Sequence, residues 1–253
     1  MPRRRPPACP PEATPGQRAA LGYNALARLA GPNLAAFAGL TEELTARGFS
    51  APRVLAADLP GGLLLLEDLG DDLFARAIPA GADEADLYRH GVDALAAIYR
   101  SSFPSELHHH GGTWHILDYD GPALLAETEL FLDWFVTRHL GRDISPADRD
   151  SWRAAWNAVF PVLETDATGL ALRDYQDALF AHPAYDLVSL LEDARRDVAP
   201  ELARAMKAHF LKAAHLSDAA AFDAAYAVLG AQRNAKILGI FVRLAIRDSK
   251  PKY

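Results

Sequence analysis

The stretch Gly169–Asp197, GLALRDYQDALFAHPAYDLVSLLEDARRD, decides how the chain is interpreted. Residues 170–172 are apolar and suit a short buried strand, and the polar residues 173–177 that follow suit a loop. A helix is expected after the next proline, over about residues 185–196. Because such a strand can aim the carboxylate of Asp174 into a cleft, this is where we expect the chemistry of the protein.

Several segments of this stretch carry a resemblance to a known family. They are residues 172–175 (LRDY), 176–179 (QDAL), 182–191 (HPAYDLVSLL) and 193–197 (DARRD). The combination resembles the aminoglycoside phosphotransferase family, a branch of the protein-kinase-like fold. The likeness is closer to its anomeric sugar kinases, which phosphorylate N-acetylmuramate and N-acetylglucosamine in cell-wall recycling. Residues 232–241, QRNAKILGIF, also resemble these sugar kinases.

The resemblance implies an α+β fold, protein-kinase-like and two-lobed, with a reduced N-terminal β lobe and a mainly helical C-terminal lobe. It also implies transfer of the ATP γ-phosphoryl group to an amino-sugar hydroxyl, with Mg²⁺ neutralising charge on that group. Asp174 would accept the hydroxyl proton, and Asp174 and Asp177 are the candidate metal ligands. Asp186 would brace the catalytic loop by hydrogen bonding. Arg233 and Lys236, one helical turn apart, would face a sugar or phosphate, or else form a structural ion pair.

The role of Asp174 stays open, because two registers fit the resemblance. Residues 173–175 resemble the catalytic-loop segment, while residues 174–176 resemble the family's metal-binding Asp-Phe-Gln. Kinase chemistry uses one Asp for the proton, an Asn a few residues on and a second Asp for the metal, but Leu179 occupies the Asn position. A hairpin is therefore expected to be missing directly after Tyr175. A loop acid with neither role is the remaining alternative for Asp174.

We expect three regions along the chain. Residues 1–31 contain clustered prolines and no sustained period, which indicates a mostly disordered lead-in. Residues 32–71 are expected to form a residual N-terminal lobe with one helix and an antiparallel strand pair. That lobe ends in three residues that resemble the adenine-binding hinge, although a core hairpin followed by a turn would look the same: Glu67, Asp68 and Leu69. Residues 72–253 are expected to form the helical phosphotransferase lobe.

Parts of the kinase machinery are expected to be lacking. We find no glycine loop that could cover phosphates, and no Lys occurs before Lys207, although the resemblance implies both. Each lost donor removes roughly 3 kcal/mol of transition-state stabilisation, so we predict weak or no kinase activity. The alternatives are a non-catalytic protein that binds nucleotide or sugar, and an inert product of a broken reading frame. The chain is expected to be truncated, because it ends at Tyr253 before the family's last helices, and internally deleted.

Composition narrows the class of protein. Half of the 253 residues are apolar, which suits a globular protein with a substantial core,. A net charge of −7 without a basic face argues against nucleic acid as a partner,. The single Cys9 suits a reducing compartment, so we expect a cytoplasmic protein. No leader or membrane-spanning segment is expected. We expect a monomer whose partners are a small-molecule sugar and a nucleotide.

Local signals predict the remaining elements. Helices are expected to begin at Asn33, Asp83, Pro122 and Ser145–Pro146. The last of these is expected to turn four apolar residues inward: Trp152, Trp156, Val159 and Leu163. Glu42 and Glu43 are expected on a solvated helix face. The histidines at positions 108–110 and 115 suggest a metal site, but adjacent glycines favour a flexible, solvated loop.

Overall fold

The computed structural model describes residues 9–164, 168–173 and 175–250. Its α-helices are α1 (Pro15–Leu21), α2 (Tyr23–Leu26), α3 (Leu34–Ala46), α4 (Phe74–Ala77), α5 (Glu84–Arg100), α6 (Gly121–Leu130), α7 (Pro146–Val159), α8 (Ala184–Leu191), α9 (Pro200–Ala213) and α10 (Ala219–Arg247). A π-helix, η1 (Phe131–His139), continues α6, and a 3₁₀ helix, η2 (Phe160–Leu163), continues α7. None of the described helices has the length and apolar character needed to cross a membrane.

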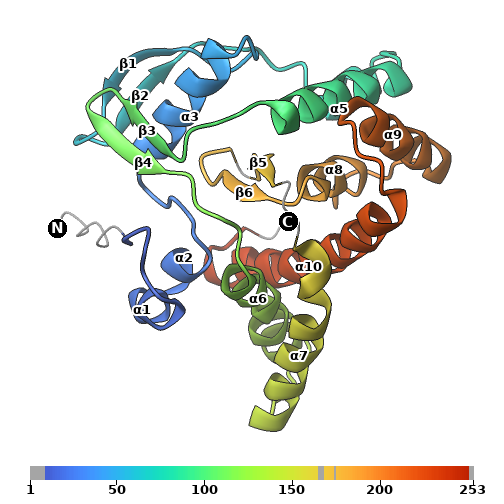
Figure 1. Ribbon diagram of the computed structural model, residues 1–253. Helices are drawn as coiled ribbons and strands as arrows, with labels where there is room; N and C mark the ends of the chain where they lie inside the picture. Colours follow the sequence, from blue (N-terminus) through green and yellow to red (C-terminus); the bar gives the residue numbers. More distant parts are fainter. Residues whose placement is uncertain (1–8, 165–167, 174, 251–253) are drawn as a thin grey trace.

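The described strands form three separate antiparallel pairs. They are β1 (Val54–Asp58) with β2 (Leu63–Leu66), β3 (Glu106–His109) with β4 (Gly112–His115), and β5 (Gly169–Ala171) with β6 (Leu179–Ala181). In Figure 1, β5, β6 and α8 lie in the middle of the molecule, with α3 and the first two strand pairs on one side. Helices α5 and α9 lie on the opposite side, and α6 and α10 lie below. This mixture of helices and small sheets is an α+β arrangement, as expected.

Capping residues fix the expected starts of three helices. Asn33 caps α3 by accepting the N–H of Ala35 at 3.0 Å, and Asp83 caps α5 in the same way. Ser145 and Asp148 form a reciprocal capping box at the start of α7. Because a helix start leaves its first amide groups without partners, these side chains define where each helix begins. These three predictions are confirmed.

Strand β5 lies between two hydrophobic clusters. The larger cluster gathers side chains of α5, α6, α8, α9 and α10, and the smaller one lies among α3, β3 and β5. Successive strand residues face opposite sides, so Leu170 joins the smaller cluster and Ala171 the larger one. Packing on both faces therefore holds the strand that leads into the loop after residue 171.

The start of the described chain differs from the expectation of a disordered lead-in. Residues 15–26 form α1 and α2, and Arg18 on α1 is only 2% exposed. Its guanidinium lies 2.7 Å from the carboxylate of Asp120, which also pairs with Arg28 at 2.9 Å and caps α6. The ordering comes from tertiary ion pairs, which proline content and periodicity do not reveal.

One further expectation is wrong, and another holds only in part. The histidine-rich segment is not a loop, because His108 and His109 belong to β3. Helix α7 turns Trp156 toward the larger hydrophobic cluster, and Leu163 of η2 packs there as well, but none of the α7 residues is fully buried and Val159 is 37% exposed. Trp152 stacks on Phe131 of η1 with ring centroids 5.3 Å apart. The aromatic residues of α7 therefore contact both a neighbouring helix and the edge of the main core.

The β1–β2 pair remains open to solvent on one face. Leu55, Leu63 and Leu65 are each more than half exposed. Residues 54–58 and 63–66 nevertheless form the antiparallel pair that the sequence predicted.

Candidate active site

The loop between β5 and β6 carries the candidate acids. It comprises residues 172–178, and Asp174 lies outside the described residues. Arg173 and Tyr175, on either side of it, both have positive φ angles, 49° and 55°. This region is unfavourable for residues with side chains and persists where surrounding contacts enforce it. Contacts of the surrounding residues must therefore hold Arg173 and Tyr175 in this conformation.

Asp186, in the first turn of α8, holds the backbone that leads into this loop. Its Oδ2 accepts the N–H of Leu172 at 2.7 Å, and its Oδ1 accepts the N–H of Arg173 at 3.2 Å. Burial raises the pKa of Asp186, and these two hydrogen bonds oppose that shift,. The carboxylate thus bonds the loop in the way proposed for Asp186, while its role in catalysis stays a prediction.

Asp177, the second candidate metal ligand, contacts the N-terminal segment. It is 8% exposed, and its Oδ1 accepts the N–H of Ala30 at 2.6 Å. Arg173 donates from Nη1 to the carbonyl oxygen of Ala27 at 3.5 Å. Two residues of the loop therefore contact the segment that follows α2. Within the described ranges, no three His, Cys, Asp or Glu side chains gather as a metal cluster.

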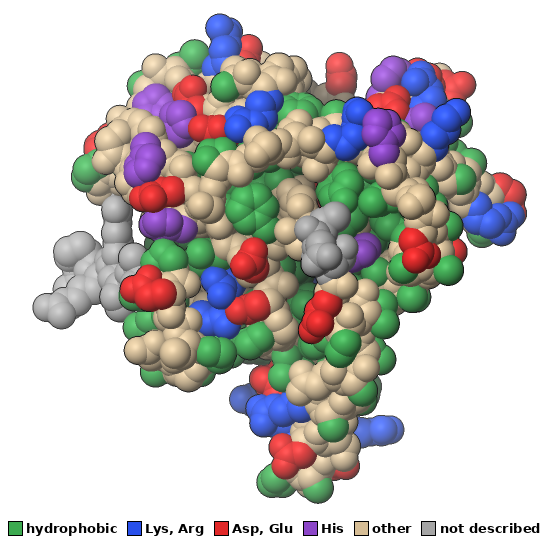
Figure 2. All heavy atoms as spheres, in the orientation of Figure 1, with side chains coloured by type: hydrophobic (Ala, Val, Ile, Leu, Met, Phe, Trp, Pro, Cys, Tyr) green, Lys and Arg blue, Asp and Glu red, His purple; other side chains and the backbone are tan. Residues whose placement is uncertain are grey.

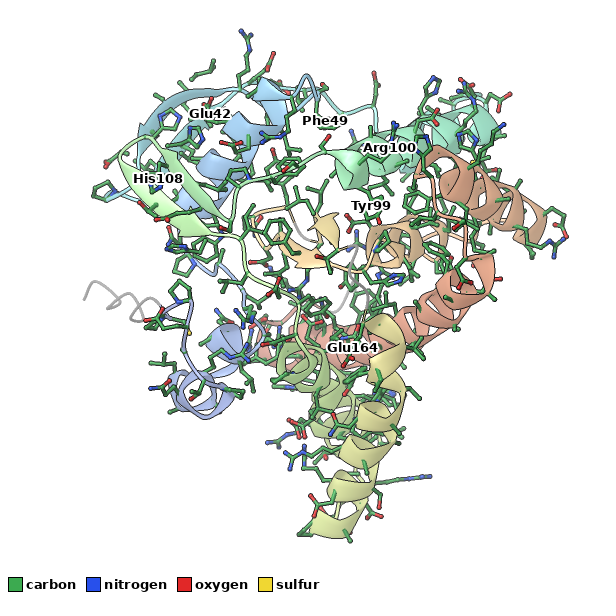
Figure 3. All side chains as sticks on the ribbon, viewed as in Figure 1. Glu42, Phe49, Tyr99, Arg100, His108 and Glu164 are labelled. Atoms are coloured by element: carbon green, nitrogen blue, oxygen red, sulfur yellow. The ribbon has the colours of Figure 1, made fainter. Side chains whose placement is uncertain are left out.

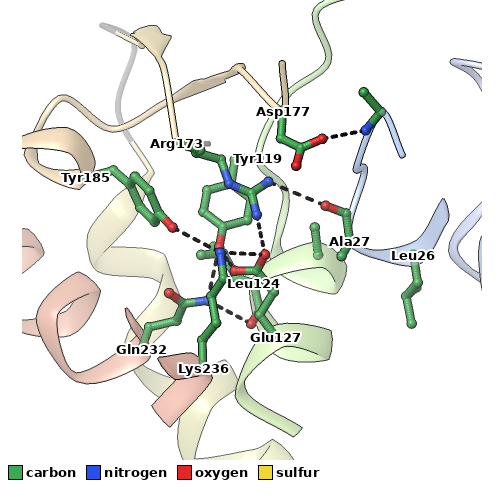
Figure 4. Close-up of polar contacts among 12 residues, drawn as sticks. Leu26, Ala27, Tyr119, Leu124, Glu127, Arg173, Asp177, Tyr185, Gln232 and Lys236 are labelled. Carbon is green, nitrogen blue, oxygen red and sulfur yellow. Dashed lines mark hydrogen bonds and ion pairs between the residues drawn. The ribbon is translucent and has the colours of Figure 1, made fainter. Parts of the chain in front are cut away.

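A buried carboxylate beneath the loop, Glu127 of α6, joins several elements (Figure 4). It forms an ion pair with Arg173, and both side chains are fully buried. Nζ of Lys236 on α10 lies 3.1 Å from the same carboxylate. The Tyr119 hydroxyl donates a hydrogen bond to Glu127, and Nε2 of Gln232 donates another at 3.2 Å. One carboxylate thus links the β5–β6 loop to α6 and α10.

The electrostatics of this cluster favour an ionised Glu127. Burial disfavours the charged form, but the positive charges of Lys236 and Arg173 outweigh it and lower the pKa of Glu127,. Burial and the neighbouring Glu127 carboxylate raise the pKa of Tyr119, which keeps its hydroxyl protonated as a donor. Two cations therefore share one carboxylate at this point of the core.

The candidate sugar contacts on α10 have different partners. Lys236 is 8% exposed and lies between Glu127 and the Tyr185 hydroxyl, the latter at 3.4 Å. Arg233 donates from Nη1 to the backbone carbonyl of Glu192 at 3.0 Å. Lys236 therefore forms a structural ion pair, which was the alternative to a sugar contact, and its partner is Glu127. Both residues line a cavity of about 170 Å³ beside α8.

The candidate hinge residues make local contacts after β2. Glu67 pairs with Arg53 at 3.2 Å, and Asp68 accepts the N–H of Gly70 at 2.8 Å. Leu69 is 57% exposed. These contacts describe the end of the strand pair and the turn after it, so the adenine contact remains a prediction.

The histidines of β3 and its turn pair with acids of α3. His109 lies 3.1 Å from Glu43, and His110 lies 3.1 Å from Glu42. Figure 2 shows histidine side chains gathered over this hairpin at the upper left, and Figure 3 labels His108 on β3 and Glu42 on α3. The expected solvated face of α3 therefore takes part in fixing the hairpin.

Sequence patterns did not point to the Glu127 cluster. Its members come from positions far apart in the chain, with Glu127 and Gln232 separated by 105 residues. The available signal is Glu127 in the largely apolar run ALLAETEL at positions 123–130, which also contains Glu129. A charge at such a position is rarely buried without a partner, so this residue could have prompted a search for cations.

Comparisons of the sequence with known proteins indicate the family of the chain. No protein-family model matches it. It is 46% identical over 269 residues to the N-acetylmuramate/N-acetylglucosamine kinase of Caulobacter vibrioides, with 97% of this chain and 73% of that protein covered. It is 31% identical to proteins of the same name from Neisseria meningitidis, over 229 residues, and Pseudomonas aeruginosa, over 234 residues. These comparisons cover 81% and 83% of this chain and 66% of each relative.

All three relatives are sugar kinases by name, and this similarity places the chain in that class. The chain belongs to the N-acetylmuramate/N-acetylglucosamine kinase family. It spans 66% to 73% of the length of these relatives.

Proposed function

We propose that this chain binds an amino sugar and a nucleotide around the β5–β6 loop, and that its ATP-dependent phosphorylation of a sugar hydroxyl is weak or absent. The observation that carries the proposal is the pair of hydrogen bonds from Leu172 and Arg173 to Asp186. They hold the backbone directly before the candidate base, Asp174. The substrate class, N-acetylmuramate or N-acetylglucosamine, follows from the names of the relatives.

The remaining parts of the proposal follow the resemblance to the aminoglycoside phosphotransferases. The protein would be a cytoplasmic monomer with a two-lobed, protein-kinase-like arrangement. Residues 67–69 would receive the adenine, and Arg233 and Lys236 would contact the sugar. Asp174 would accept the proton of the attacking hydroxyl.

The two acids of the loop suit magnesium chemically. Mg²⁺ is commonly held by one or two carboxylates together with substrate phosphates rather than by an all-protein cage. Asp174 and Asp177 would provide these carboxylates. When bound, the ion would neutralise negative charge on the transferred phosphoryl group.

The comparisons support an internal deletion. The alignment with the C. vibrioides relative spans 269 positions, whereas 97% of this 253-residue chain is about 245 residues. About 24 positions of the alignment therefore have no residue of this chain, and the other relatives give nearly the same difference. We place this deletion directly after Tyr175, where the expected Asn spacing fails. It would leave Asp174 to serve two roles that kinases divide between two aspartates.

Measuring both binding and turnover tests the proposal. The purified chain is incubated with ATP and either sugar, with and without Mg²⁺, and sugar phosphate is followed by ³¹P NMR, with the C. vibrioides relative as positive control. Calorimetry measures binding of each sugar and of ATP. We expect binding and little or no product.

A restored variant sharpens the test. It carries the extra segment of the C. vibrioides relative inserted after Tyr175, and we expect it to form more product than the unaltered chain. Asp174→Asn in the restored variant should abolish the gain. Magnesium-dependent turnover by the unaltered chain, lost in Asp174→Asn, would overturn the proposed impairment. Absence of binding to both sugars and to ATP would leave the inert product as the explanation.

A further inference from the structure

A cavity of about 270 Å³ lies beside the N-terminal helices. In Figure 1, α1 and α2 are at the lower left with β4 above them, and residues of all three elements line the cavity. Its lining is mostly apolar and includes six such side chains: Pro10, Leu21, Leu29, Pro32, Trp114 and Leu117. The described lining residues include none of residues 67–69, 173–177, 233 and 236. The cavity is therefore distinct from the candidate active site.

Three polar side chains of this lining have hydrogen-bonding groups available for a ligand. Arg28 binds Asp120 through Nε and Nη2, and its Nη1 has no partner among the described residues. The side-chain amide of Asn24 and the indole N–H of Trp114 are likewise without a hydrogen bond within the described part of the chain. All three groups donate N–H, so they suit a ligand group rich in acceptor oxygens.

The charge of the lining favours an anion. Arg18 and Arg28 both pair with the carboxylate of Asp120, at 2.7 and 2.9 Å. In the ranges that the structure describes, neither arginine has a second carboxylate at ion-pair distance, so two cations share one acid. A ligand carboxylate would add the second negative charge and accept a charge-assisted hydrogen bond from Arg28.

We propose that this cavity binds a small aromatic carboxylate. Nη1 of Arg28 donates to the carboxylate, and Asn24 and Trp114 supply further donors. The ring of the ligand lies among the apolar side chains, where Trp114 offers an aromatic partner. Ligand pockets combine a mostly apolar lining with a few placed polar groups, and this cavity has both. The site goes beyond the proposed function, because it shares no residue with the sugar and nucleotide contacts.

A ligand in this cavity also contacts the segment that holds the β5–β6 loop. Ala30 lines the cavity and donates its backbone N–H to Asp177 at 2.6 Å. A ligand stabilises the conformation that it binds, so occupancy should slow hydrogen exchange at the Ala30 amide. The cavity is thereby linked to the position of Asp177.

Calorimetry with the full chain measures three probes: phenylacetate, phenylacetamide, which has the same shape without the charge, and acetate, which lacks the ring. We expect phenylacetate to bind at least about tenfold more tightly than either of the others. Arg28→Gln should weaken phenylacetate binding about tenfold, as loss of a charge-assisted hydrogen bond predicts, and change phenylacetamide binding less than about twofold. Arg28→Lys should recover part of the loss.

A matched control removes the same charge elsewhere. Arg204 of α9 forms an exposed pair with Glu201, so Arg204→Gln should leave all affinities unchanged. Thermal unfolding verifies that each variant is folded. If Arg28→Gln is not, Asn24→Ala serves instead, because it removes an amide that makes no hydrogen bond among the described residues, and it too should weaken phenylacetate binding. Hydrogen exchange at Ala30 should slow on addition of phenylacetate to the unaltered chain.

The outcomes decide between the proposed ligand and its alternatives. Equal affinities for phenylacetate and phenylacetamide, or for phenylacetate and acetate, overturn the ligand class. An unchanged phenylacetate affinity in Arg28→Gln shows binding elsewhere and overturns the site. Inorganic phosphate that binds more tightly than phenylacetate, and is lost in Arg28→Gln, assigns the cavity to phosphate and overturns the carboxylate. Unchanged exchange at Ala30 overturns the link to Asp177. Binding of sugar and ATP is measured separately, so failure of the proposed function leaves this site standing.

Discussion

The Arg173 guanidinium and the Glu127 carboxylate form an ion pair in which neither side chain is exposed to solvent. The pair joins the loop after β5 to α6, and Lys236 brings α10 to the same carboxylate. Desolvation offsets much of the attraction within a buried pair, so its presence adds little stability compared with an apolar packing. Removing one partner is different, because it strands a charge in the core.

Glu127→Gln should therefore destabilise the protein strongly. The substitution removes the carboxylate that pairs with both Arg173 and Lys236, and we expect the free energy of unfolding to fall by about 3–5 kcal/mol. Urea denaturation followed by circular dichroism measures the change. Glu201→Gln, which breaks the exposed pair with Arg204, is the control and should have little effect. Similar losses in both variants would contradict the importance assigned to the buried cluster.

Asp186→Asn should loosen the loop. The Asn side chain has one acceptor oxygen, so it is unable to accept both backbone amides that Asp186 accepts now. We expect the free energy of unfolding to fall by about 1–3 kcal/mol. Hydrogen exchange at Leu172 and Arg173 should become faster. Asp58→Asn, at an exposed turn where Asp58 accepts the N–H of Gly61, is the matched control, and unchanged exchange at residues 172–173 in Asp186→Asn would refute this interpretation.

His182 should make stability depend on pH. Burial lowers its pKa from 6.5 to about 4, and its Nδ1 accepts the N–H of Ala184 at 3.1 Å, which requires that nitrogen to be unprotonated. The unfolded chain binds the proton more readily, so the folded state loses stability as pH falls from about 6.5 toward 4. Denaturation at several pH values should show a smaller decline in His182→Gln than in the unaltered chain.

The exposed His90 of α5 provides the comparison for that measurement. Its side chain is 62% exposed, so His90→Gln should retain the steep decline of the unaltered chain between pH 6.5 and 4. Parallel curves for all three proteins would show that His182 does not contribute to this dependence.

Gly239→Ala should disturb the contact between α10 and the end of α6. An added Cβ at Gly239 would lie 2.3 Å from the backbone carbonyl of Leu130, far inside contact distance. We expect a loss of about 1–3 kcal/mol or more, because backbone atoms are unable to move aside as a flexible side chain does. Gly16→Ala in α1 has no heavy atom within 4 Å of its new Cβ and should be neutral or slightly stabilising. Thermal unfolding compares the two.

Local signals in the sequence predicted the elements that local contacts define. Asn33, Asp83 and Ser145 mark helix starts because their side chains satisfy amide groups a few residues away. The β3–β4 pair was missed because its histidines and glycines suggest a loop, whereas contacts with Glu42 and Glu43 of α3 help to hold it. Such partners are distant in the chain, so no local pattern includes them.

In the candidate site, too, the sequence indicated a contiguous motif but not the contacts between residues that are distant in the chain. Asp186, which lies in a contiguous motif, accepts hydrogen bonds from Leu172 and Arg173, and its role in the reaction stays a prediction. The cluster around Glu127 depends on α6, α10 and the β5–β6 loop meeting in space, and sequence spacing contains no such information. The helical spacing of the aromatic residues of α7 did not distinguish Trp156, which packs against the main core, from Trp152, which stacks on Phe131 of the neighbouring helix.

The open β1–β2 pair has a consequence for handling the protein. A two-stranded sheet has two outer strand edges, and here the neighbouring face also exposes Leu55, Leu63 and Leu65. Unpaired backbone groups next to leucine side chains form a template for strand addition. Self-association and turbidity should therefore begin at this hairpin when the protein is concentrated. A lysine at position 63 or 65 is the substitution to choose for improving solubility.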